Sequence, residues 1–244
     1  MKLAWRWLGR AVLAVVGLVL LLQVWYFVSI GWYRFHDPAS TAFMRSHMAL
    51  VRTSDPAAKL EHRWVPYERI ADNLKRAVIT SEDARFAEHE GVDWDAIAKA
   101  YDNNERVGGA KADATAKSKV AARIKGGSTI TQQLAKNLFL SGERSYLRKG
   151  QELVITYMLE FWLSKQRILE IYLNVIEWGS GVFGAEAAAH HYFNVTAAQL
   201  NASQAAQLAV MLPNPRFYDT RRGSPYLARR SAVIARWMKD AELP

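Results

Sequence analysis

The sequence predicts a mainly α-helical domain preceded by one membrane-spanning helix. Apolar residues recur every three or four positions, for example at Ile70, Leu74 and Val78, and the same spacing occurs in 153–161, 168–172 and 204–212. No run of alternating apolar and polar residues indicates a strand, and no segment is repeated. A single long apolar stretch near the N-terminus completes the pattern.

That apolar stretch, residues 11–33, has no charged side chain, and only Gln23 in it is strongly polar. At about 1.5 Å per residue it would form a helix of roughly 35 Å, enough to cross a bilayer. Lys2, Arg6 and Arg10 precede it, which predicts a cytoplasmic N-terminus. A cleaved signal peptide is the alternative, but the stretch is long for a signal core and no small-x-small cleavage site follows. We therefore expect an uncleaved single-pass anchor.

The anchor divides the chain into four parts: a cytoplasmic N-terminus at 1–10, the membrane helix at 11–33, a tether at 34–63 containing Pro38 and Pro56, and a domain at 64–244. The last part is long enough for one domain with its own core. Everything after the anchor would lie outside the inner leaflet.

Charge and composition limit the classes of partner. The formal net charge is +9, and three of these charges precede the membrane stretch, so the remainder of the chain is still basic. A basic surface beside a membrane favours anionic or phosphorylated lipids, whereas export and the lack of a nucleic-acid-binding motif argue against nucleic acid. The chain has no cysteine, which excludes disulfides and Cys-ligated zinc.

Segment 126–140 carries the strongest local signal. Two glycines followed by Ser128 and Thr129 suit a helix start, where N–H groups and the helix dipole favour an anion. Gln132 and Lys136 would share one helix face, and Gln133 and Asn137 the next. The order of residues does not match a nucleotide-binding P-loop. A phosphate or pyrophosphate site is one interpretation, and an ordinary amphipathic helix is the other.

The preceding segment, 102–125, is rich in Ala, Lys, Gly and Asn and has few large apolar residues. It resembles a loop or a partly frayed helix. Because it leads directly into the Gly-Gly-Ser-Thr helix, it would be placed to act as a flap over a site there. A solvated insertion without a role is the equal alternative.

Segment 80–95 contains candidate proton-transfer groups. Glu82 and Asp83 follow an apolar helix face, and a carboxylate at such an edge suits proton transfer. Phe86 and Trp94 would be platforms for sugar rings, and Asp93 is placed to cap the next helix. The alternative is a charged surface turn with Phe86 in the core.

A third segment groups cations around one carboxylate. Arg144, Arg148 and Glu152 are spaced four apart, and Lys149 lies three before Glu152. These residues form either a surface salt-bridge ladder or a cationic clamp that keeps Glu152 ionised. His89 has no companion histidine at ligand spacing, so a structural hydrogen bond is favoured over a metal role.

The ordered combination resembles the glycosyltransferase domain of bacterial peptidoglycan polymerases, the family 51 glycosyltransferases. The matching segments are Glu82–Gly91, Gly126–Asn137, Arg148–Glu152, Lys165–Asn174, Gly184–Ala189 with Tyr192-Phe193, and Met211–Pro215. They cover nearly all of the chain after residue 64. No Ser-x-x-Lys followed by Lys-Thr-Gly occurs, so the resemblance is to the monofunctional members that lack a transpeptidase domain.

The resemblance implies a lysozyme-like helical fold with a smaller membrane-proximal lobe, carrying polymerisation of lipid II into β-1,4-linked glycan. The growing lipid-linked chain is transferred to the 4-hydroxyl of lipid II with inversion, and undecaprenyl diphosphate is released. Glu82 would be the general base, and Glu152, the second catalytic carboxylate, would orient cations or a divalent ion at the donor pyrophosphate. Substrate-binding roles fall on Asp83, Phe86, His89, Ser128, Gln132, Gln133, Lys136, Asn137, Arg144, Arg148 and Lys149.

The same resemblance implies location and partners. We expect a bacterial inner-membrane protein with its domain in the periplasm, contacting the membrane, lipid II and the growing glycan strand. Cell-wall elongation or division proteins are further candidate partners, and nucleic acid is not. No cofactor is required by the sequence and no metal ligands are assigned, although Mg²⁺ or Mn²⁺ held by the phosphates is compatible with it.

Two alternatives stay open. A lytic transglycosylase or lysozyme-like hydrolase would also use a catalytic Glu, but it needs a general acid rather than a pyrophosphate clamp. An inactive membrane-anchored scaffold for cell-wall proteins is the other, although both Glu82 and Glu152 are present.

Overall fold

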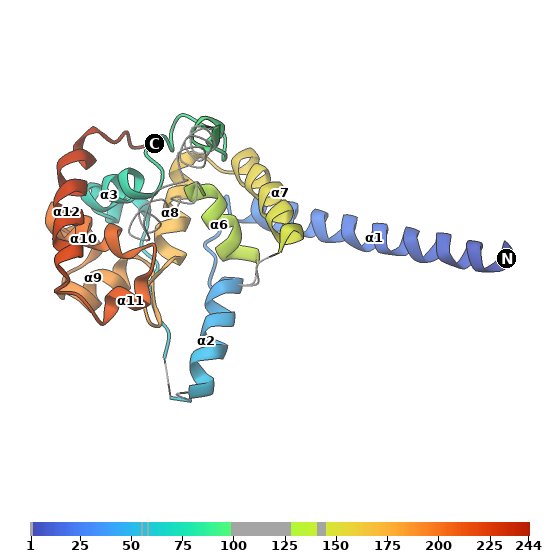
Figure 1. Cartoon of the computed structure of the whole chain (residues 1–244), viewed down its shortest axis with the longest axis horizontal. Coiled ribbons are helices and arrows are strands. Elements are labelled where there is room, and N and C mark those ends of the chain that lie inside the picture. Colours follow the sequence, from blue (N-terminus) through green and yellow to red (C-terminus); the bar gives the residue numbers. More distant parts are fainter. Residues whose placement is uncertain (1, 55, 58, 99–127, 141–144) are drawn as a thin grey trace, which may run out of the picture.

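The computed structural model describes residues 2–54, 56–57, 59–98, 128–140 and 145–244. The described part is mainly helical, and one long apolar helix precedes the domain, which confirms the predicted fold class (Figure 1). The helices are α1 (Lys2–Trp32), α2 (Ala42–Ser54), α3 (Asp72–Glu82), α6 (Ile130–Phe139), α7 (Tyr146–Trp162), α8 (Lys165–Val175), α9 (Ala185–Phe193), α10 (Ala202–Met211), α11 (Pro215–Asp219) and α12 (Pro225–Trp237). Short 3₁₀ turns occupy Tyr67–Arg69, Ala197–Gln199 and Met238–Asp240.

Helix α8 forms the centre of the domain. Its residues Ile168, Leu169, Ile171 and Tyr172 are fully buried, and it contacts α6, α7 and α9. A helix that is buried on nearly all sides must be apolar around most of its circumference. On one side of the domain, α10 packs between α3 and α12. The ends of α3 and α6, which carry the first two motifs, are therefore supported by the core.

Three short strands were not predicted. β1 (Glu61–His62) pairs in parallel with β3 (Val182–Phe183), and β3 pairs antiparallel with β2 (Glu177–Gly179), giving the order β1-β3-β2. Strands of two or three residues are too short to produce a recognisable alternating pattern. Both residues of β3 are buried, so the strands belong to the core rather than to a solvated sheet.

The segment expected to be a tether, 34–63, contains helix α2. Thr41 caps it by accepting a 3.0 Å hydrogen bond from the Met44 N–H. Met44 and Met48 are buried, and α2 packs against α6. The lower part of α2 projects from the domain in Figure 1. The boundary at residue 64 stays a prediction, but this segment is a helix with packed side chains rather than an irregular linker.

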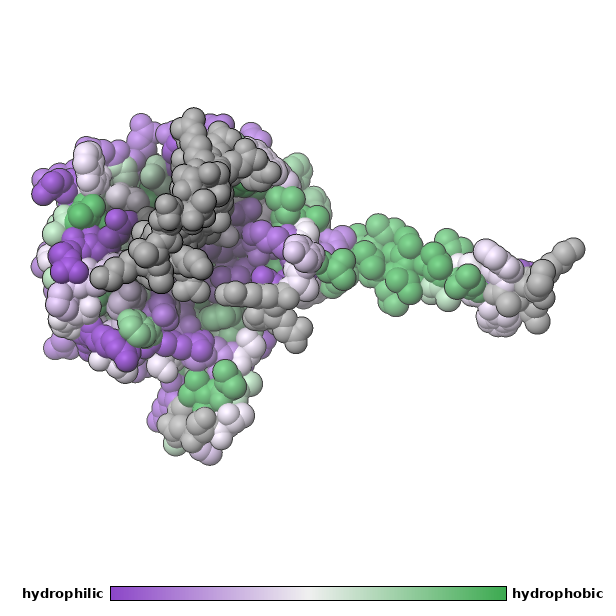
Figure 2. Space-filling view, viewed as in Figure 1, coloured by the Kyte–Doolittle hydropathy of each residue, from purple (hydrophilic) through white to green (hydrophobic). Residues whose placement is uncertain are grey.

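Helix α1 extends away from the domain over most of its length (Figure 1). From Trp5 to Trp32 it is apolar and long enough to span a membrane, and the most apolar 18-residue window in it has a mean hydropathy of 2.5 and few buried residues. Its apolar surface is continuous between the domain and the N-terminal end in Figure 2. Among the described residues, its outer part touches the domain, mainly against α7 and also at Phe139 of α6. The arrangement is consistent with a single-pass anchor.

Candidate active site

Glu82 occupies the last position of α3. The inner face of this helix is fixed in the core by Leu74, Val78 and Ile79, and the helix ends because Asp83 adopts a non-helical conformation. The Glu82 side chain is half-buried. Gln133 of α6 donates a 2.9 Å hydrogen bond from Nε2 to its Oε2. The first two motifs, distant in sequence, therefore meet at this carboxylate.

The orientation of Gln133 is set by Tyr172 of α8. The Tyr172 hydroxyl donates a 2.9 Å hydrogen bond to Gln133 Oε1, so the amide must present its NH₂ group to Glu82. Burial raises the pKa of Tyr172 well above its ordinary value, and the charges of Glu82 and Asp83 act in the same direction. The hydroxyl consequently stays protonated. The hydrogen bonds therefore run in one direction, with Tyr172 donating to Gln133 and Gln133 donating to Glu82.

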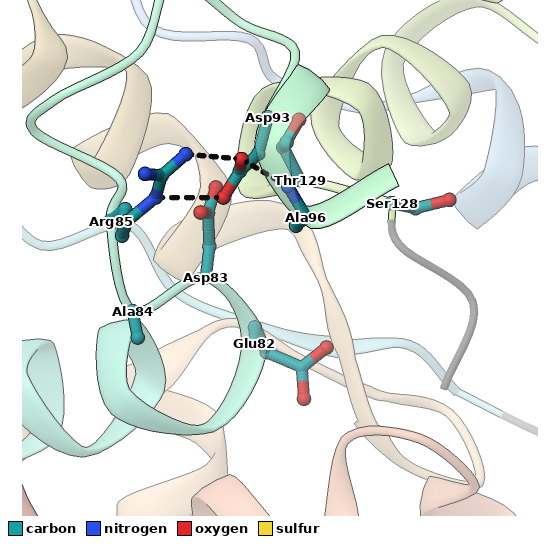
Figure 3. Close-up of a pocket in the computed structure, with 8 residues that line it drawn as sticks. All are labelled: Glu82, Asp83, Ala84, Arg85, Asp93, Ala96, Ser128 and Thr129. Atoms are coloured by element: carbon teal, nitrogen blue, oxygen red, sulfur yellow. Dashed lines mark hydrogen bonds and ion pairs between the residues drawn. The ribbon is translucent and has the colours of Figure 1, made fainter. Parts of the chain in front are cut away.

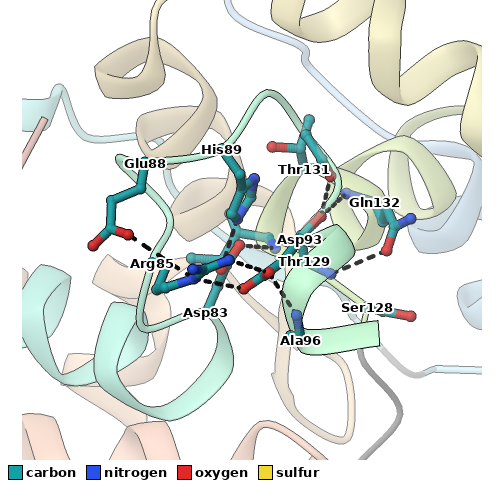
Figure 4. Close-up of polar contacts among 12 residues, drawn as sticks. Asp83, Arg85, Glu88, His89, Asp93, Ala96, Ser128, Thr129, Thr131 and Gln132 are labelled. Atoms are coloured by element: carbon teal, nitrogen blue, oxygen red, sulfur yellow. Dashed lines mark hydrogen bonds and ion pairs between the residues drawn. The ribbon is translucent and has the colours of Figure 1, made fainter. Parts of the chain in front are cut away.

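Asp83 links three segments through a buried carboxylate. It accepts a 3.0 Å hydrogen bond from the Ile130 N–H at the start of α6 and a 2.9 Å hydrogen bond from His89 Nε2 (Figure 4). His89 thus makes the structural hydrogen bond that was favoured for it. Both side chains are almost fully buried. Their expected substrate-binding roles stay untested, and in this structure they hold the site together.

The start of α6 has the predicted N-terminal cap. The N–H group of Ile130 at this helix start is not free to bind an anion. Thr129 and Gln132 form a reciprocal capping box, and the Thr129 hydroxyl donates a 2.6 Å hydrogen bond to the Gly91 carbonyl. The Ile130 N–H, which the sequence offered to a phosphate, is taken by Asp83. A negative charge already complements the helix dipole here. The anion-binding capacity of the site must come from elsewhere.

Elsewhere in the site, a cationic cavity of about 310 Å³ is lined by Phe43, Ser128, Gln132, Gln133, Lys136, Arg148, Lys149 and Glu152. Glu152 is 4% exposed and contacts Lys149 and, at 3.4 Å, Arg148. The helical spacing correctly placed these three residues together. Burial lowers the pKa of Lys136, and the nearby Glu152 opposes that shift. Three cations around one carboxylate leave a net positive charge that suits a multiply charged anion.

A second cavity of about 290 Å³, the carboxylate cavity, lies on the other side of Glu82. It is lined by Glu82, Asp83, Ala84, Arg85, Asp93, Ala96, Ser128 and Thr129 (Figure 3). Ser128 lines both cavities, and the hydrogen-bonded Glu82 and Gln133 line one each. Figure 3 shows Glu82 pointing away from the Arg85–Asp93 pair. The carboxylate therefore stands at the border between a cationic compartment and a second compartment, an arrangement for two substrates.

A model of the Transglycosylase family matches residues 48–239. The chain belongs to this family. The biosynthetic peptidoglycan transglycosylase of Herminiimonas arsenicoxydans is 60% identical over 244 residues, covering 100% of both chains. Those of Bordetella pertussis and Thiobacillus denitrificans are 54% and 53% identical over the whole of this chain, covering 97% and 100% of their own lengths.

The structure of this transglycosylase chain contradicts one expected substrate contact, that of Phe86, and buries a second residue, Asn137, whose role stays untested. Phe86 is fully buried, with the Lys165 ammonium 4.7 Å from its ring centre, so it is a core residue and offers no face to a sugar. Asn137 is buried, and its side chain donates a 2.8 Å hydrogen bond to the Gln133 carbonyl. Trp94, by contrast, is 59% exposed. Arg144 and the segment 102–125 lie outside the described residues.

The segment after Glu82 is held by an ion pair that sequence reasoning did not identify. Arg85 binds Asp93, with Nε 3.1 Å from Oδ2, and lowers the pKa of that carboxyl group (Figure 4). Asp93 also accepts a 2.8 Å hydrogen bond from the Ala96 N–H, which confirms its predicted cap. Sequence reasoning also missed Tyr172 and Phe43. No local pattern identifies either residue, because their partners lie far away in the chain.

Proposed function

We propose that the chain is a monofunctional peptidoglycan glycosyltransferase. It transfers the lipid-linked glycan to the 4-hydroxyl of lipid II, forms a β-1,4 bond with inversion and releases undecaprenyl diphosphate. The observation that carries this proposal is the position of Glu82 between the cationic cavity and the carboxylate cavity. One compartment suits a pyrophosphate donor, and the other admits a neutral acceptor sugar.

Glu82 would act as the general base. Its carboxylate takes the proton of the acceptor 4-hydroxyl while that oxygen attacks the donor anomeric carbon from the face opposite the pyrophosphate. The new C–O bond forms as the bond to the pyrophosphate oxygen breaks, which converts the α-linked donor to a β-linked product. Gln133 donates a hydrogen bond to the carboxylate and thereby favours its ionised form. The base is thus held charged and oriented before the acceptor arrives.

The cationic cavity would stabilise the leaving group. Lys136, Arg148 and Lys149 can neutralise the pyrophosphate as the glycosidic bond breaks. Arg148 Nε is buried and has no hydrogen-bond partner within the described residues, so a donor is available there. Glu152 holds Arg148 and Lys149 in place and offsets part of their mutual repulsion. A pyrophosphate is already a good leaving group, so these charges matter more than a general acid.

A divalent cation at the donor remains a separate proposal. Within the described residues, no three His, Asp or Glu side chains converge in a way that could hold a metal ion. Among the described residues that line the cationic cavity, Glu152 is the one carboxylate, and it is engaged by Lys149 and Arg148. A bound Mg²⁺ or Mn²⁺ would therefore take most of its ligands from the phosphates and water.

A hydrolase fits the site less well. Glycosidases flank the scissile bond with two carboxyl groups, one of them a general acid. Asp83 is the carboxylate next to Glu82, but its hydrogen bonds to Ile130 and His89 hold it inside the protein. A lytic enzyme would also have no use for the cluster of cations. The synthetic direction is therefore the better match.

The membrane-facing side supports a lipid-linked substrate. Exposed apolar residues of α7, among them Leu147, Val154 and Phe161, lie on the helix that α1 packs against. Such a surface is suited to the membrane interface. With Arg6 and Arg10 at the inner end of α1, the N-terminus would lie in the cytoplasm and the domain in the periplasm of the inner membrane. Elongation or division proteins stay predicted partners.

Glycan formation from purified labelled lipid II tests the proposal. We expect polymer from the wild type and none from Glu82→Gln, which removes the base with little change in shape. Glu88→Gln is the matched control, because Glu88 is an exposed carboxylate of the same segment. Normal polymerisation by the folded Glu82→Gln variant would remove Glu82 from the base role. Cleavage of preformed glycan by the wild type would indicate the lytic alternative, and complete inactivity of the folded wild type would favour the scaffold.

A further inference from the structure

Gln23 and Gln151 exchange two hydrogen bonds between α1 and α7. Gln23 Nε2 donates to Gln151 Oε1 at 2.8 Å, and Gln151 Nε2 donates to Gln23 Oε1 at 3.0 Å. Gln23 is the one strongly polar residue in the uncharged stretch 11–33. An amide in apolar surroundings is costly unless it is paired, and polar residues of membrane helices find partners on neighbouring helices. The pair therefore fixes the rotation and the height of α1 against α7.

Gln151 neighbours two residues of the cationic cavity in the chain, although it does not itself line the cavity. It directly precedes Glu152 in the chain and follows Lys149 by two positions, so the same two turns of α7 carry the clamp and the contact with α1. At the other end of α7, a Cβ on Gly31 would lie 3.2 Å from the Trp162 ring. Apolar contact at that end allows close approach, whereas the amide pair supplies a directional bond between α1 and α7 near the clamp.

Helix α1 also contacts α6, which carries the third cation. The rings of Trp25 and Tyr26 lie 5.9 Å and 5.2 Å from the ring of Phe139, in edge-to-face contact. Phe139 follows Lys136 by one turn. The outer part of α1 is thus in contact with both helices that position the cationic cavity.

The position of the Gln23–Gln151 pair along α1 fits the outer surface of the membrane. For the amide pair to stand at the outer boundary, residues 5–22 must cross the hydrocarbon, as about 27 Å of helix. This shifts the span inward from the expected 11–33 and requires the side chains of Arg6 and Arg10 to extend to the inner headgroups. The charged neighbours of Gln151 must lie outside the hydrocarbon. Gln23 would therefore stand at the outer boundary, where the pyrophosphate of a membrane lipid emerges.

We infer that the Gln23–Gln151 pair positions the cationic cavity at the level of the lipid pyrophosphate, so that α1 is part of the donor site as well as an anchor. This inference rests on the proposed function. A slip of α1 by one helical turn would displace the clamp by about 5.4 Å, enough to separate it from the pyrophosphate. Apolar packing alone tolerates such slippage better than a reciprocal amide pair does.

Kinetics in lipid vesicles test the role. Gln23→Leu and Gln151→Leu should each raise the lipid II concentration for half-maximal rate roughly three- to tenfold with little change in kcat, the range expected for losing a polar contact between membrane helices. The double variant should need no higher lipid II concentration for half-maximal rate than the more affected single variant, because each single substitution already removes the same contact. Leu21→Val, on the exposed side of α1, is the control. Wild-type half-saturation in the single variants, or fully additive effects, would overturn the inference.

Cross-linking tests the contact independently of activity. The chain has no cysteine, so a Gln23→Cys/Gln151→Cys variant in vesicles carries the only two thiols. A short bismaleimide should join them within one chain, whereas Leu21→Cys/Gln151→Cys should give little product. Equal yields would refute the contact. If the wild type made no glycan, the proposed function would fail, while this arm would still decide whether α1 docks on α7 as described.

Discussion

Replacing Tyr172 by Phe should uncouple Glu82, the proposed catalytic base, from the core. The change removes one hydroxyl and preserves the ring, so packing around α8 is maintained. Gln133 then loses the 2.9 Å hydrogen bond that fixes its amide orientation. Besides the bond to Glu82, the amide contacts the Ser128 carbonyl from Nε2 at 3.4 Å, which is too long to fix its orientation. A flipped amide would present its oxygen to Glu82, and the hydrogen bond to the carboxylate would be replaced by repulsion.

The magnitude follows from the lost bond. A hydrogen bond to a charged group is worth about 1.5–3 kcal/mol, and one pH unit corresponds to about 1.4 kcal/mol. Complete loss would move the acid limb of the pH–rate profile upward by about one to two units, because the donor favoured the ionised base. The lost buried bond should also lower stability by about 1 kcal/mol. The direction of the shift is fixed: as the pH is lowered, the variant should lose activity at a higher pH than the wild type.

The assay is the initial rate of glycan formation at saturating lipid II, measured from acid to alkaline pH. Tyr192→Phe is the matched control, since the Tyr192 hydroxyl donates hydrogen bonds to Trp178 and Asp219, remote from Glu82. The control should lose stability without moving the acid limb. A Tyr172→Phe enzyme with the wild-type pH profile would refute the orienting role of Tyr172.

Three further outcomes follow from the structure. Because burial lowers the pKa of Lys136, its charge should be lost at lower pH than in an ordinary lysine, so activity should decline early on the alkaline side. Lys136→Arg, which stays charged, should move that limb to higher pH in the same series, and an unmoved limb would exclude Lys136 as its source. Gly91→Ala should destabilise the fold by about 1–3 kcal/mol in thermal unfolding, since Gly91 has φ +82° and a Cβ there would lie 2.7 Å from Thr156; an unchanged Tm would show that the loop relaxes. Phe86→Ala should cost about 3–5 kcal/mol in denaturant unfolding as a core cavity, and a small cost with weakened sugar binding would instead restore the platform interpretation.

The features predictable from the sequence are those that a single helix determines. Arg148 and Glu152 meet because residues four apart share a helix face, whatever the rest of the fold does. Thr129 caps α6 because Ser and Thr residues satisfy the N–H groups of a helix start within a few residues. The resemblance to a family then assigned roles that local spacing alone left open.

The features that could not be predicted depend on contacts across the chain. The Ile130 N–H was a reasonable anion donor until Asp83, from another motif, was found bound to it. Phe86 lies in a charged segment, where an aromatic ring can serve as a surface platform. The packing of α8, with Lys165 against the ring, shows instead that Phe86 is buried. Phe43 belongs to a segment without visible periodicity, yet it lines the cationic cavity. In each case the deciding partner is distant in sequence.

The two sides of the site are supported differently, and this difference suits a polymerase. The base is oriented by Tyr172, a fully buried residue of the central helix, so its geometry is fixed by the core. The clamp lies on α7 next to Gln151, which pairs with Gln23 of α1, so its geometry depends on the membrane anchor. A glycan polymerase that acts as proposed must repeatedly capture and release a lipid pyrophosphate while its base stays in place. Variants near Tyr172 should therefore change kcat and the pH profile, whereas variants near Gln151 should change the apparent affinity for lipid II. If both groups altered the same kinetic parameter, this division between a rigid base and a membrane-set clamp would be wrong.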